Sequence, residues 1–206
     1  MLDPMIHAGT LAPRLHRPDA PDLLDLRLEA DAAGSTRLPG ARRLSLVEVE
    51  AGAPVGPEAV VYCQKGGKIS QIGAALLRAR GIAARALVGG HLGWDGPTVA
   101  LEAPALRWVA PLDPAWAGVA AEWVLRRLID RTARVVRVEA DEVDAAAALW
   151  PARILPDDAS GLAASVGLSH PVLPRLAPTP GAERMLAGTR ALGRDPLAVI
   201  DAWVAA

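Results

Sequence analysis

The segment Ala59–Ile69 constrains the fold of this chain more strongly than any other. Four apolar residues, AVVY, end at Cys63 and lead through the pair Gly66 and Gly67 into ISQIGAALLRARG. A short continuous apolar run bounded by Pro and Gly is typical of a strand buried within a parallel sheet. The segment therefore predicts a central strand, a glycine loop and a helix in succession.

The helix is predicted from the three- and four-residue spacing of its apolar positions, which is the period of an amphipathic helix. These positions are Ile69, Ile72, Ala75, Leu76 and Ala79. Gly81 fits the position that ends the helix, because glycine readily adopts the left-handed conformation found there.

Further strand signals lie on both sides of this unit. Asp22–Arg27 and Ala83–Val88 are each predicted to form a short buried strand, and the Pro-Gly pair within Arg37–Ala41 predicts a turn. Leu44–Val49 fits either a short strand or a helical turn. Alternating units of this kind predict an α/β fold, in which a parallel sheet carries helices on both faces.

The composition excludes several classes of function. The 22 basic and 23 acidic side chains nearly cancel, and without a long run of Lys or Arg we expect no nucleic-acid partner. A single cysteine rules out an internal disulfide and a cysteine-based zinc cluster, and the four scattered histidines lack the close spacing of metal ligands. We therefore expect neither a metal nor a cofactor.

The cellular location is also an expectation from the sequence. No segment approaches the roughly 18 apolar residues of a membrane span, so we expect no membrane partner. The N-terminal stretch MLDPMIHAGTLAPRL lacks the basic region and long apolar core of a signal peptide. These features predict a cytoplasmic protein whose thiol the compartment keeps reduced.

The pattern changes near Pro104, where a new segment begins that includes RWVA. We place a domain boundary there, with domains at residues 1–103 and 104–206. The second domain is predicted to be mainly helical. Its expected elements are helices over Trp116–Ile129, Asp141–Leu149 and Pro196–Trp203, and a strand over Arg134–Glu139.

Cys63 is the first candidate for chemistry. A cysteine that ends a buried strand before a glycine loop and a helix lies where the loop N–H groups and the positive end of the helix dipole converge. Lys65 and Lys68 add positive charge. Each feature favours thiolate over thiol, which predicts a lowered pKa and a cradle for an anionic donor such as thiosulfate. The alternative is a buried structural cysteine, the commoner fate of a lone cysteine.

Four segments that occur in order resemble the rhodanese family, over about residues 18–96. They are LLDLR, RLPGA, VVYCQKGGKIS and LVGGHLGW. The resemblance implies a rhodanese-like sulfurtransferase. In this family a cysteine thiolate takes a sulfane sulfur from a donor, becomes a persulfide and passes the sulfur to a nucleophilic acceptor.

The resemblance also implies roles for individual residues. Cys63 would be the nucleophile and Lys68 would close its loop as the second catalytic residue, while Asp25, Arg27 and Ser70 would support the loop. The implied donor-binding residues are Gln64, Lys65, Gly66, Gly67 and Ile69. The residues that match the family's structural closing turn are Gly89, Gly90 and Trp94.

Lys68 departs from the family pattern, because the loop of many active members ends in arginine at this position. Arginine offers a planar fork for two oxygens and lysine a point charge, so we expect altered donor binding. The six residues from Cys63 through Lys68 fit a sulfur-sized substrate. The related phosphatases and arsenate reductases use a loop one residue longer that closes on arginine, which disfavours those activities.

His91 is expected to have a surface or packing role rather than to act as a general base.

The second half, from RWVAPLDPAW to RVEADEV, resembles the C-terminal domain of the chromate-resistance regulator family. Polar positions of that family are occupied here by Ala115, Ala117, Gly118 and Ala121. We therefore expect a scaffold or homodimerisation domain without the family's metal or anion site. Arg126 and Arg127 are the remaining anion-binding candidates, although pairing of Arg126 with Asp130 four residues on would explain them equally well.

Two hypotheses remain open. The first is an enzyme, a thiosulfate or persulfide sulfurtransferase that works through a Cys63 persulfide. Its partners would be a small sulfur donor and an acceptor from another molecule, either a thiol or cyanide, because the chain has no second cysteine. The alternative is a non-catalytic protein that senses anions or oxidation during chromate or oxyanion stress.

Overall fold

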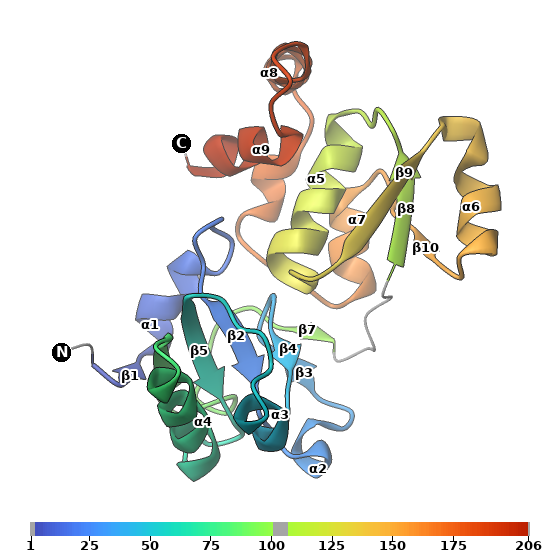
Figure 1. The fold of residues 1–206 in the computed structure, drawn as a ribbon. Coiled ribbons are helices and arrows are strands. Elements are labelled where there is room, and N and C mark those ends of the chain that lie inside the picture. The colour runs from blue at the N-terminus through green and yellow to red at the C-terminus, as the bar shows by residue number, and fades with distance from the viewer. Residues whose placement is uncertain (1–2, 101–106, 206) are drawn as a thin grey trace. The chain divides into compact units, whose positions relative to one another are not determined.

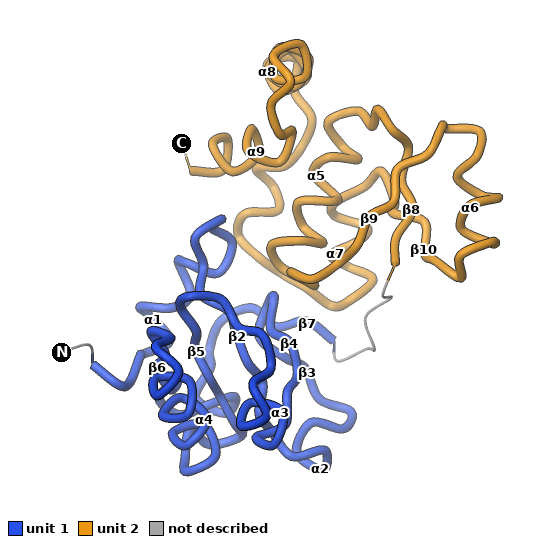
Figure 2. Tube along the Cα trace, in the orientation of Figure 1, with its two compact units in different colours: residues 1–101 blue, residues 102–206 orange. Residues whose placement is uncertain are grey.

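Strand β5 (Glu58–Tyr62) lies at the centre of a parallel sheet in the computed structural model of the chain (Figure 1). The structure describes residues 3–100 and 107–205. The chain divides into two compact units, Met1–Leu101 and Glu102–Ala206, and each is considered by itself (Figure 2).

Within residues 3–100, five parallel strands form the main sheet, in the order β1-β6-β5-β2-β4. The strands other than β5 are β1 (Met5–Ile6), β2 (Asp22–Asp25), β4 (Arg42–Arg43) and β6 (Ala83–Leu87). The predicted buried strands and their parallel arrangement are therefore confirmed. A separate antiparallel pair joins β3 (Thr36–Arg37) to β7 (Val99–Ala100).

Side chains alternate along the strands and build a separate apolar core on each face of the sheet. Val60 and Tyr62 of β5 belong to one core, which also contains Leu11 of helix α1 (Ala8–Leu11). Val61 belongs to the other core, with residues of helices α3 (Leu46–Glu50) and α4 (Lys68–Ala79). The helices thus cover both faces, as the sequence predicted (Figure 1). The remaining helices of this unit are the 3-10 helix η1 (Ala12–Arg14) and α2 (Glu29–Ala32).

The buried stripe of α4 differs from the predicted apolar one. Its buried residues are Ser70, Gly73, Ala74 and Leu77. Ile72 is 48% exposed, Ala75 and Ala79 are also exposed, and Ile69 and Leu76 are only partly buried. A Cβ at Gly73 would lie 2.5 Å from Cδ1 of Leu26 and 3.3 Å from Cγ1 of Val61. The helix therefore approaches the sheet so closely that small residues, rather than the largest apolar ones, form the contact.

Local hydrogen bonds determine the conformation of the two short segments before β5, Arg37–Ala41 and Leu44–Val49. Leu44–Val49 contains the helix α3 rather than a strand, because Ser45 and Glu48 form a reciprocal capping box. The predicted turn at Arg37–Ala41 is confirmed: the Ala41 N–H donates to the carbonyl of Leu38 at 3.1 Å.

The second unit is built on its own parallel sheet. Within residues 107–205, three strands lie in the order β10-β8-β9. They are β8 (Arg107–Pro111), β9 (Arg134–Val138) and β10 (Arg153–Ile154). The helices are α5 (Trp116–Val124), α6 (Val143–Leu149), α7 (Ala159–Ser165), α8 (Pro180–Ala191) and α9 (Pro196–Ala205). Short 3-10 helices occur at η3 (Ala140–Glu142) and η4 (Leu173–Leu176), and α5 continues as the π-helical turn η2 (Leu125–Ile129). Helices predominate, as predicted, but the parallel sheet was not anticipated.

The predicted pairing of Arg126 with Asp130 is wrong. Arg126 Nε donates to Glu122 Oε1 at 2.8 Å, one helical turn before it. Asp130 has left the helix, with φ −144° and ψ 103°, and its carboxylate accepts instead from the N–H and hydroxyl of Thr132. The end of the helix thus separates the two residues that the four-residue spacing had brought together.

Among the residues that the structure describes, no helix combines the length and the apolar character that are needed to cross a bilayer.

Candidate active site

Cys63 lies directly after β5, at the carboxyl end of the central strand, and is only 6% exposed. The loop that follows it ends at Gly67, which precedes the first residue of α4, Lys68. The Sγ atom of Cys63 lies 3.3 Å from Oγ of Ser70 in the first turn of that helix. The predicted arrangement of strand, cysteine, glycine loop and helix is therefore present, with the sulfur at its centre.

The surroundings of Cys63 lower its pKa. Burial of the thiol raises the pKa, but it is outweighed by hydrogen bonds from the Ser70 hydroxyl and from the backbone N–H groups of Ser70, Lys65 and Gly67. Hydrogen bonds to a charged form favour that form. The net direction is a pKa below that of an ordinary cysteine, so the loop favours the nucleophilic thiolate.

Ser70 connects the sulfur to the loop backbone. Its hydroxyl donates to the carbonyl of Gly67 at 3.0 Å while its oxygen faces Sγ. In the thiol form the S–H group can donate to the Ser70 oxygen, and after deprotonation the hydroxyl can rotate and donate to the sulfur. Ser70 therefore has the geometry of the local hydrogen-bonding residue expected from the sequence.

Replacing Ser70 with alanine is expected to raise the pKa of Cys63, because one hydrogen bond to the thiolate is lost while burial remains. The rate of alkylation by iodoacetamide, measured against pH, should shift its midpoint to higher pH and fall severalfold near neutrality. Ser165→Ala is a matched control, since Ser165 also donates to the carbonyl three residues before it, in the second unit. An unchanged alkylation profile in Ser70→Ala would remove Ser70 from the set of groups that stabilise the thiolate.

The turn predicted to close the fold lies directly under the cysteine loop. The N–H of His91 donates to the carbonyl of Cys63 at 2.9 Å, and the N–H of Leu92 donates to the carbonyl of Gln64 at 3.0 Å. Gly66 and Gly90 have φ of 66° and 59°, and a Cβ on Gly90 would lie 2.3 Å from the Gly66 nitrogen. Both glycines are therefore required by the contact between the two backbones.

The predicted donor-binding residues divide into two groups. Lys65 and Lys68 extend exposed side chains, and a Cβ on Gly67 would meet no atom within 4 Å. The outer side of the loop is therefore open beside Gly67. Gln64 is partly buried, and Gly66 is buried against the closing turn. Of the predicted donor-binding residues, Lys65 and Gly67 hydrogen-bond the sulfur through their backbone N–H groups.

Asp25 and Arg27 form a buried ion pair, with both side chains fully inaccessible. Arg27 donates to the Asp25 carboxylate through Nη2 at 2.7 Å and through Nε at 3.0 Å. It also donates to Oγ of Ser35 and to the carbonyl of Thr36. Burial lowers the pKa of Arg27, but the hydrogen bonds and charge of Asp25 outweigh it and raise the pKa, so the guanidinium stays charged. The pair thus connects the end of β2 to Ser35 and to the first residue of β3.

His91 packs against its neighbours rather than standing at the sulfur. Its ring stacks on Tyr62 with centroids 6.4 Å apart, and Nε2 lies 3.4 Å from Oγ1 of Thr36. Burial and the nearby charge of Arg27 lower the pKa of His91. These contacts match the packing role expected from the sequence.

A cavity of about 480 Å³ opens at the carboxyl ends of β2 and β4, on the edge of the sheet where ligands bind in open α/β folds. Because Asp25 pairs with Tyr62 in the β2–β5 register, Leu26 lies opposite Cys63. The Leu26 N–H donates to the carbonyl of Tyr62 at 2.8 Å. Leu26 lines the cavity, and so does Ile69. The cavity therefore adjoins the cysteine loop.

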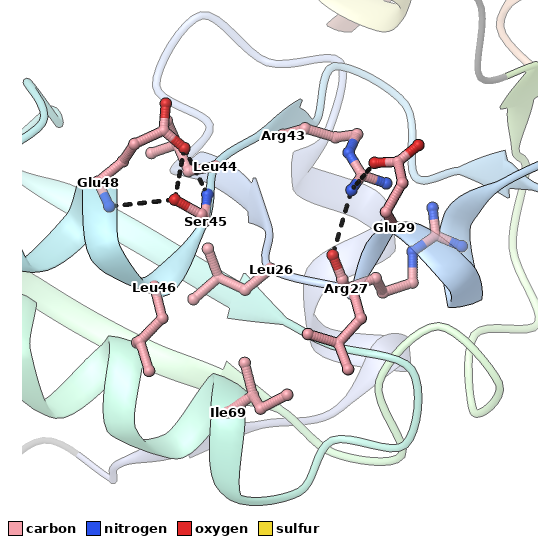
Figure 3. Close-up of a pocket in the computed structure, with 10 residues that line it drawn as sticks. Leu26, Arg27, Glu29, Arg43, Leu44, Ser45, Leu46, Glu48 and Ile69 are labelled. Carbon is pink, nitrogen blue, oxygen red and sulfur yellow. Dashed lines mark hydrogen bonds and ion pairs between the residues drawn. The ribbon is translucent and has the colours of Figure 1, made fainter.

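The walls of this cavity differ in character (Figure 3). Leu26, Leu46 and Ile69 gather on one side. The polar residues Glu29, Arg43, Ser45 and Glu48 lie around them. Arg43 Nη2 lies 3.0 Å from Oε2 of Glu29. Of the lining residues, sequence reasoning had selected Arg27 and Ile69 as site residues. The others lie in two runs, residues 26–29 around Arg27 and residues 43–48, and no spacing pattern connects the two runs.

In the parts of the chain that the structure describes, no group of three or more His, Cys, Asp or Glu side chains is placed to hold a metal ion.

Comparisons with known proteins find similarity over less than half of the chain. No family model matches the sequence, and no curated protein matches it significantly. A rhodanese homologue from the bacterium Thermus thermophilus is 27% identical, with 43% of this chain and 96% of the homologue covered, at a TM-score of 0.35. A protein from Staphylococcus saprophyticus is 20% identical, with 43% and 89% covered, at 0.37.

A third similar structure is that of a protein from Rhodopseudomonas palustris, described as a possible tyrosine phosphatase. It is 18% identical, with 44% of this chain and 77% of that protein covered, at a TM-score of 0.37. These comparisons give no support to the resemblance of the second half to the chromate-resistance regulators.

Proposed function

We propose that the chain is a rhodanese-type sulfurtransferase that carries sulfane sulfur as a persulfide on Cys63. The observation that carries the proposal is the hydrogen-bonded position of Sγ, which lowers the pKa of the Cys63 thiol in spite of its burial. A structural cysteine needs no such donors. The four sequence segments that resemble the rhodanese family agree with this function.

The first half-reaction loads the sulfur. With thiosulfate as donor, the Cys63 thiolate attacks the outer sulfur and forms a new S–S bond. The S–S bond of thiosulfate breaks, and sulfite leaves with the electron pair. The backbone N–H groups that stabilise the thiolate would also stabilise the negative terminal sulfur of the persulfide. Lys65 and Lys68 are exposed beside the loop and would attract the anionic donor.

The second half-reaction unloads the sulfur. A thiolate or cyanide attacks the terminal sulfur of the persulfide, the S–S bond breaks, and Cys63 leaves as a thiolate. The acceptor must come from another molecule, because Cys63 is the only cysteine of the chain. A reducing compartment such as the cytoplasm would supply such thiols and keep Cys63 free.

The deciding experiment is a thiosulfate–cyanide assay of the full chain and of Cys63→Ser. We expect the wild type to form thiocyanate and Cys63→Ser to fall to the background rate, because a serine hydroxyl is not ionised near neutral pH. Mass spectrometry of the donor-treated protein should show a gain of one sulfur atom that dithiothreitol removes. A wild type that forms neither thiocyanate nor the sulfur adduct with thiosulfate, glutathione persulfide or polysulfide would contradict the proposal and favour the non-catalytic sensing alternative.

Lys68→Arg tests the departure from the family pattern. A guanidinium can contact two oxygens of thiosulfate at once, whereas the ammonium of lysine acts as a point charge. We therefore expect kcat/KM for thiosulfate to rise severalfold in Lys68→Arg. Lys65→Arg is the matched control, since it changes the same side chain type in the same loop and should have a smaller effect. Equal effects of the two substitutions would show that position 68 has no special part in donor binding.

A further inference from the structure

The second unit contains a cavity of about 360 Å³, and all of its lining residues belong to that unit. Three arginines line it: Arg126 from the π-helical turn after α5, Arg137 from β9 and Arg190 from α8. Two carboxylates, Glu122 and Asp195, also line it, and its apolar part is formed by Leu112, Pro114, Val119, Pro196 and Leu197. A volume of this size is within the range of small-molecule sites.

Two of the arginines share one buried carboxylate. The Glu122 side chain is 5% exposed, and it accepts from Arg126 through Oε1 and from Arg137 through Oε2. One carboxylate balances one guanidinium, so this cluster carries a surplus positive charge beside the cavity. The side chains of Arg126 and Arg137 are 32% and 29% exposed, so both guanidiniums remain within reach of an anion that enters the cavity.

The third arginine, Arg190, has a carboxylate partner of its own, which does not neutralise the charge of the other two. Arg190 pairs with Asp113, whose side chain is 79% exposed, so water screens the pair. Arg190 also donates to the carbonyl of Pro114. The other carboxylate of the lining, Asp195, accepts from the N–H of Leu197 at the start of α9. The cavity wall therefore holds three guanidiniums and two carboxylates, one of which stabilises a helix terminus.

The two terminal Nη groups of Arg126 are available as hydrogen-bond donors. It contacts Glu122 through Nε, and no residue in the described ranges accepts a hydrogen bond from either of its terminal Nη groups. Arg126 also lies in the π-helical turn Leu125–Ile129, and such turns occur often at functional sites. Arg127, the other anion-binding candidate of the sequence analysis, differs: its Nε and Nη2 both contact Asp201.

We propose that this cavity binds a small organic carboxylate, with its two oxygens on the Nη groups of Arg126 and its apolar body against the apolar lining residues. A planar carboxylate matches the fork of a guanidinium. Inorganic phosphate or sulfate would satisfy the charge but leave the apolar wall uncovered. The site is independent of Cys63, and nothing in it depends on sulfur transfer.

The experiment is isothermal titration calorimetry of the full chain with benzoate, hexanoate, benzyl alcohol and inorganic phosphate at low ionic strength. We expect benzoate or hexanoate to bind and benzyl alcohol not to bind. Arg126→Gln should weaken carboxylate binding by about tenfold or more, the effect of losing a charge-assisted pair of hydrogen bonds. Arg126→Lys should weaken it less, because it keeps the charge beside Glu122.

Arg184→Gln is the matched control. Arg184 lies in α8 with Arg190 but outside the cavity lining, and its loss changes the net charge by the same amount. It should leave binding unchanged, and unfolding curves of all variants should establish that they fold. The proposal is overturned if neither carboxylate binds the wild type up to about 10 mM, if Arg126→Gln and Arg184→Gln bind equally, or if phosphate binds more tightly than both carboxylates.

Discussion

Gly90→Ala is expected to destabilise the first unit by at least about 4 kcal/mol, a loss found only for changes with a specific structural cause. A Cβ at this position would lie 2.2 Å from the carbonyl oxygen of Cys63 and 2.3 Å from the Gly66 nitrogen. Both are backbone atoms, so no side-chain rotation relieves the overlap. The backbone φ of 59° adds a further cost for any residue with a Cβ.

Urea unfolding followed by circular dichroism measures this effect, and the assay of sulfur transfer should fall with it because the cysteine loop loses its support. Gly67→Ala is the matched control. Gly67 lies in the same loop, but its φ is −89° and a Cβ there would meet no atom within 4 Å. We expect Gly67→Ala to stay close to wild-type stability. Similar unfolding midpoints for the two variants would show that the close contact of the two backbones is not what holds the loop.

Asp25→Ala is expected to cost about 3–5 kcal/mol, because it leaves the guanidinium of Arg27 buried without a counter-charge. Denaturant unfolding of the variant measures the loss. Asp19→Ala is the control: it removes a carboxylate from the exposed pair with Arg17, whose side chains are 59% and 67% exposed. That change should cost less than about 1 kcal/mol.

A double substitution separates the charge from the packing. Asp25→Leu combined with Arg27→Met removes both charges and keeps much of the volume, so most of the lost stability should return. The contacts of Arg27 to Ser35 and Thr36 are still absent in this variant. If the double variant is as unstable as Asp25→Ala, the buried charge is not the main cause of the loss.

Local patterns predicted the first unit well. The apolar run before Cys63 is the central strand, and the helix after Gly67 begins and ends within two residues of the predicted bounds. Such features depend on neighbours in sequence, and the backbone geometry of a strand–loop–helix unit leaves few alternatives. The direction of the Cys63 pKa could also be predicted, because the loop donors lie within seven residues of the sulfur.

The buried face of α4 was not predictable from its apolar spacing. In a helix rich in small residues, two neighbouring stripes of residues follow the same helical period. The prediction placed the stripe with more large apolar residues, such as Ile69 and Ile72, on the buried face. The sheet instead selects the stripe with Gly73, since Leu26 and Val61 occupy the space that a side chain would need.

The secondary structure of the second unit was predicted less completely, for two local reasons. Helix α8 begins at Pro180, and Thr179 accepts from the N–H of Ala182 as its N-terminal cap. A Thr-Pro pair is a helix start signal, and it was not used in the sequence analysis. Strand β10 is two residues long, too short for any periodicity. The central strand β8 was not predicted either, so its parallel pairing with β9 was missed.

The arginine cavity lay beyond sequence reasoning for a different reason. Arg137 and Arg190 come from a strand and a helix far apart in the chain, and neither belongs to a motif. Arg126 was selected from its position in a helix, but its partner Glu122 was not, because the spacing to Asp130 offered an equally simple pair. Only the fold brings these charges together.

The hydrogen bonds at Cys63 have a consequence for how this loop can evolve. Three of the donors that lower the pKa of Cys63 are backbone N–H groups, those of Lys65, Gly67 and Ser70. A backbone N–H stays in place when the side chain of its residue changes. The side chains at Gln64, Lys65 and Lys68 can therefore be exchanged during divergence, retargeting the loop to another donor, while the acidity of the thiol is inherited unchanged. Reactivity and specificity are therefore encoded in separate atoms of the same short segment, residues 63–70.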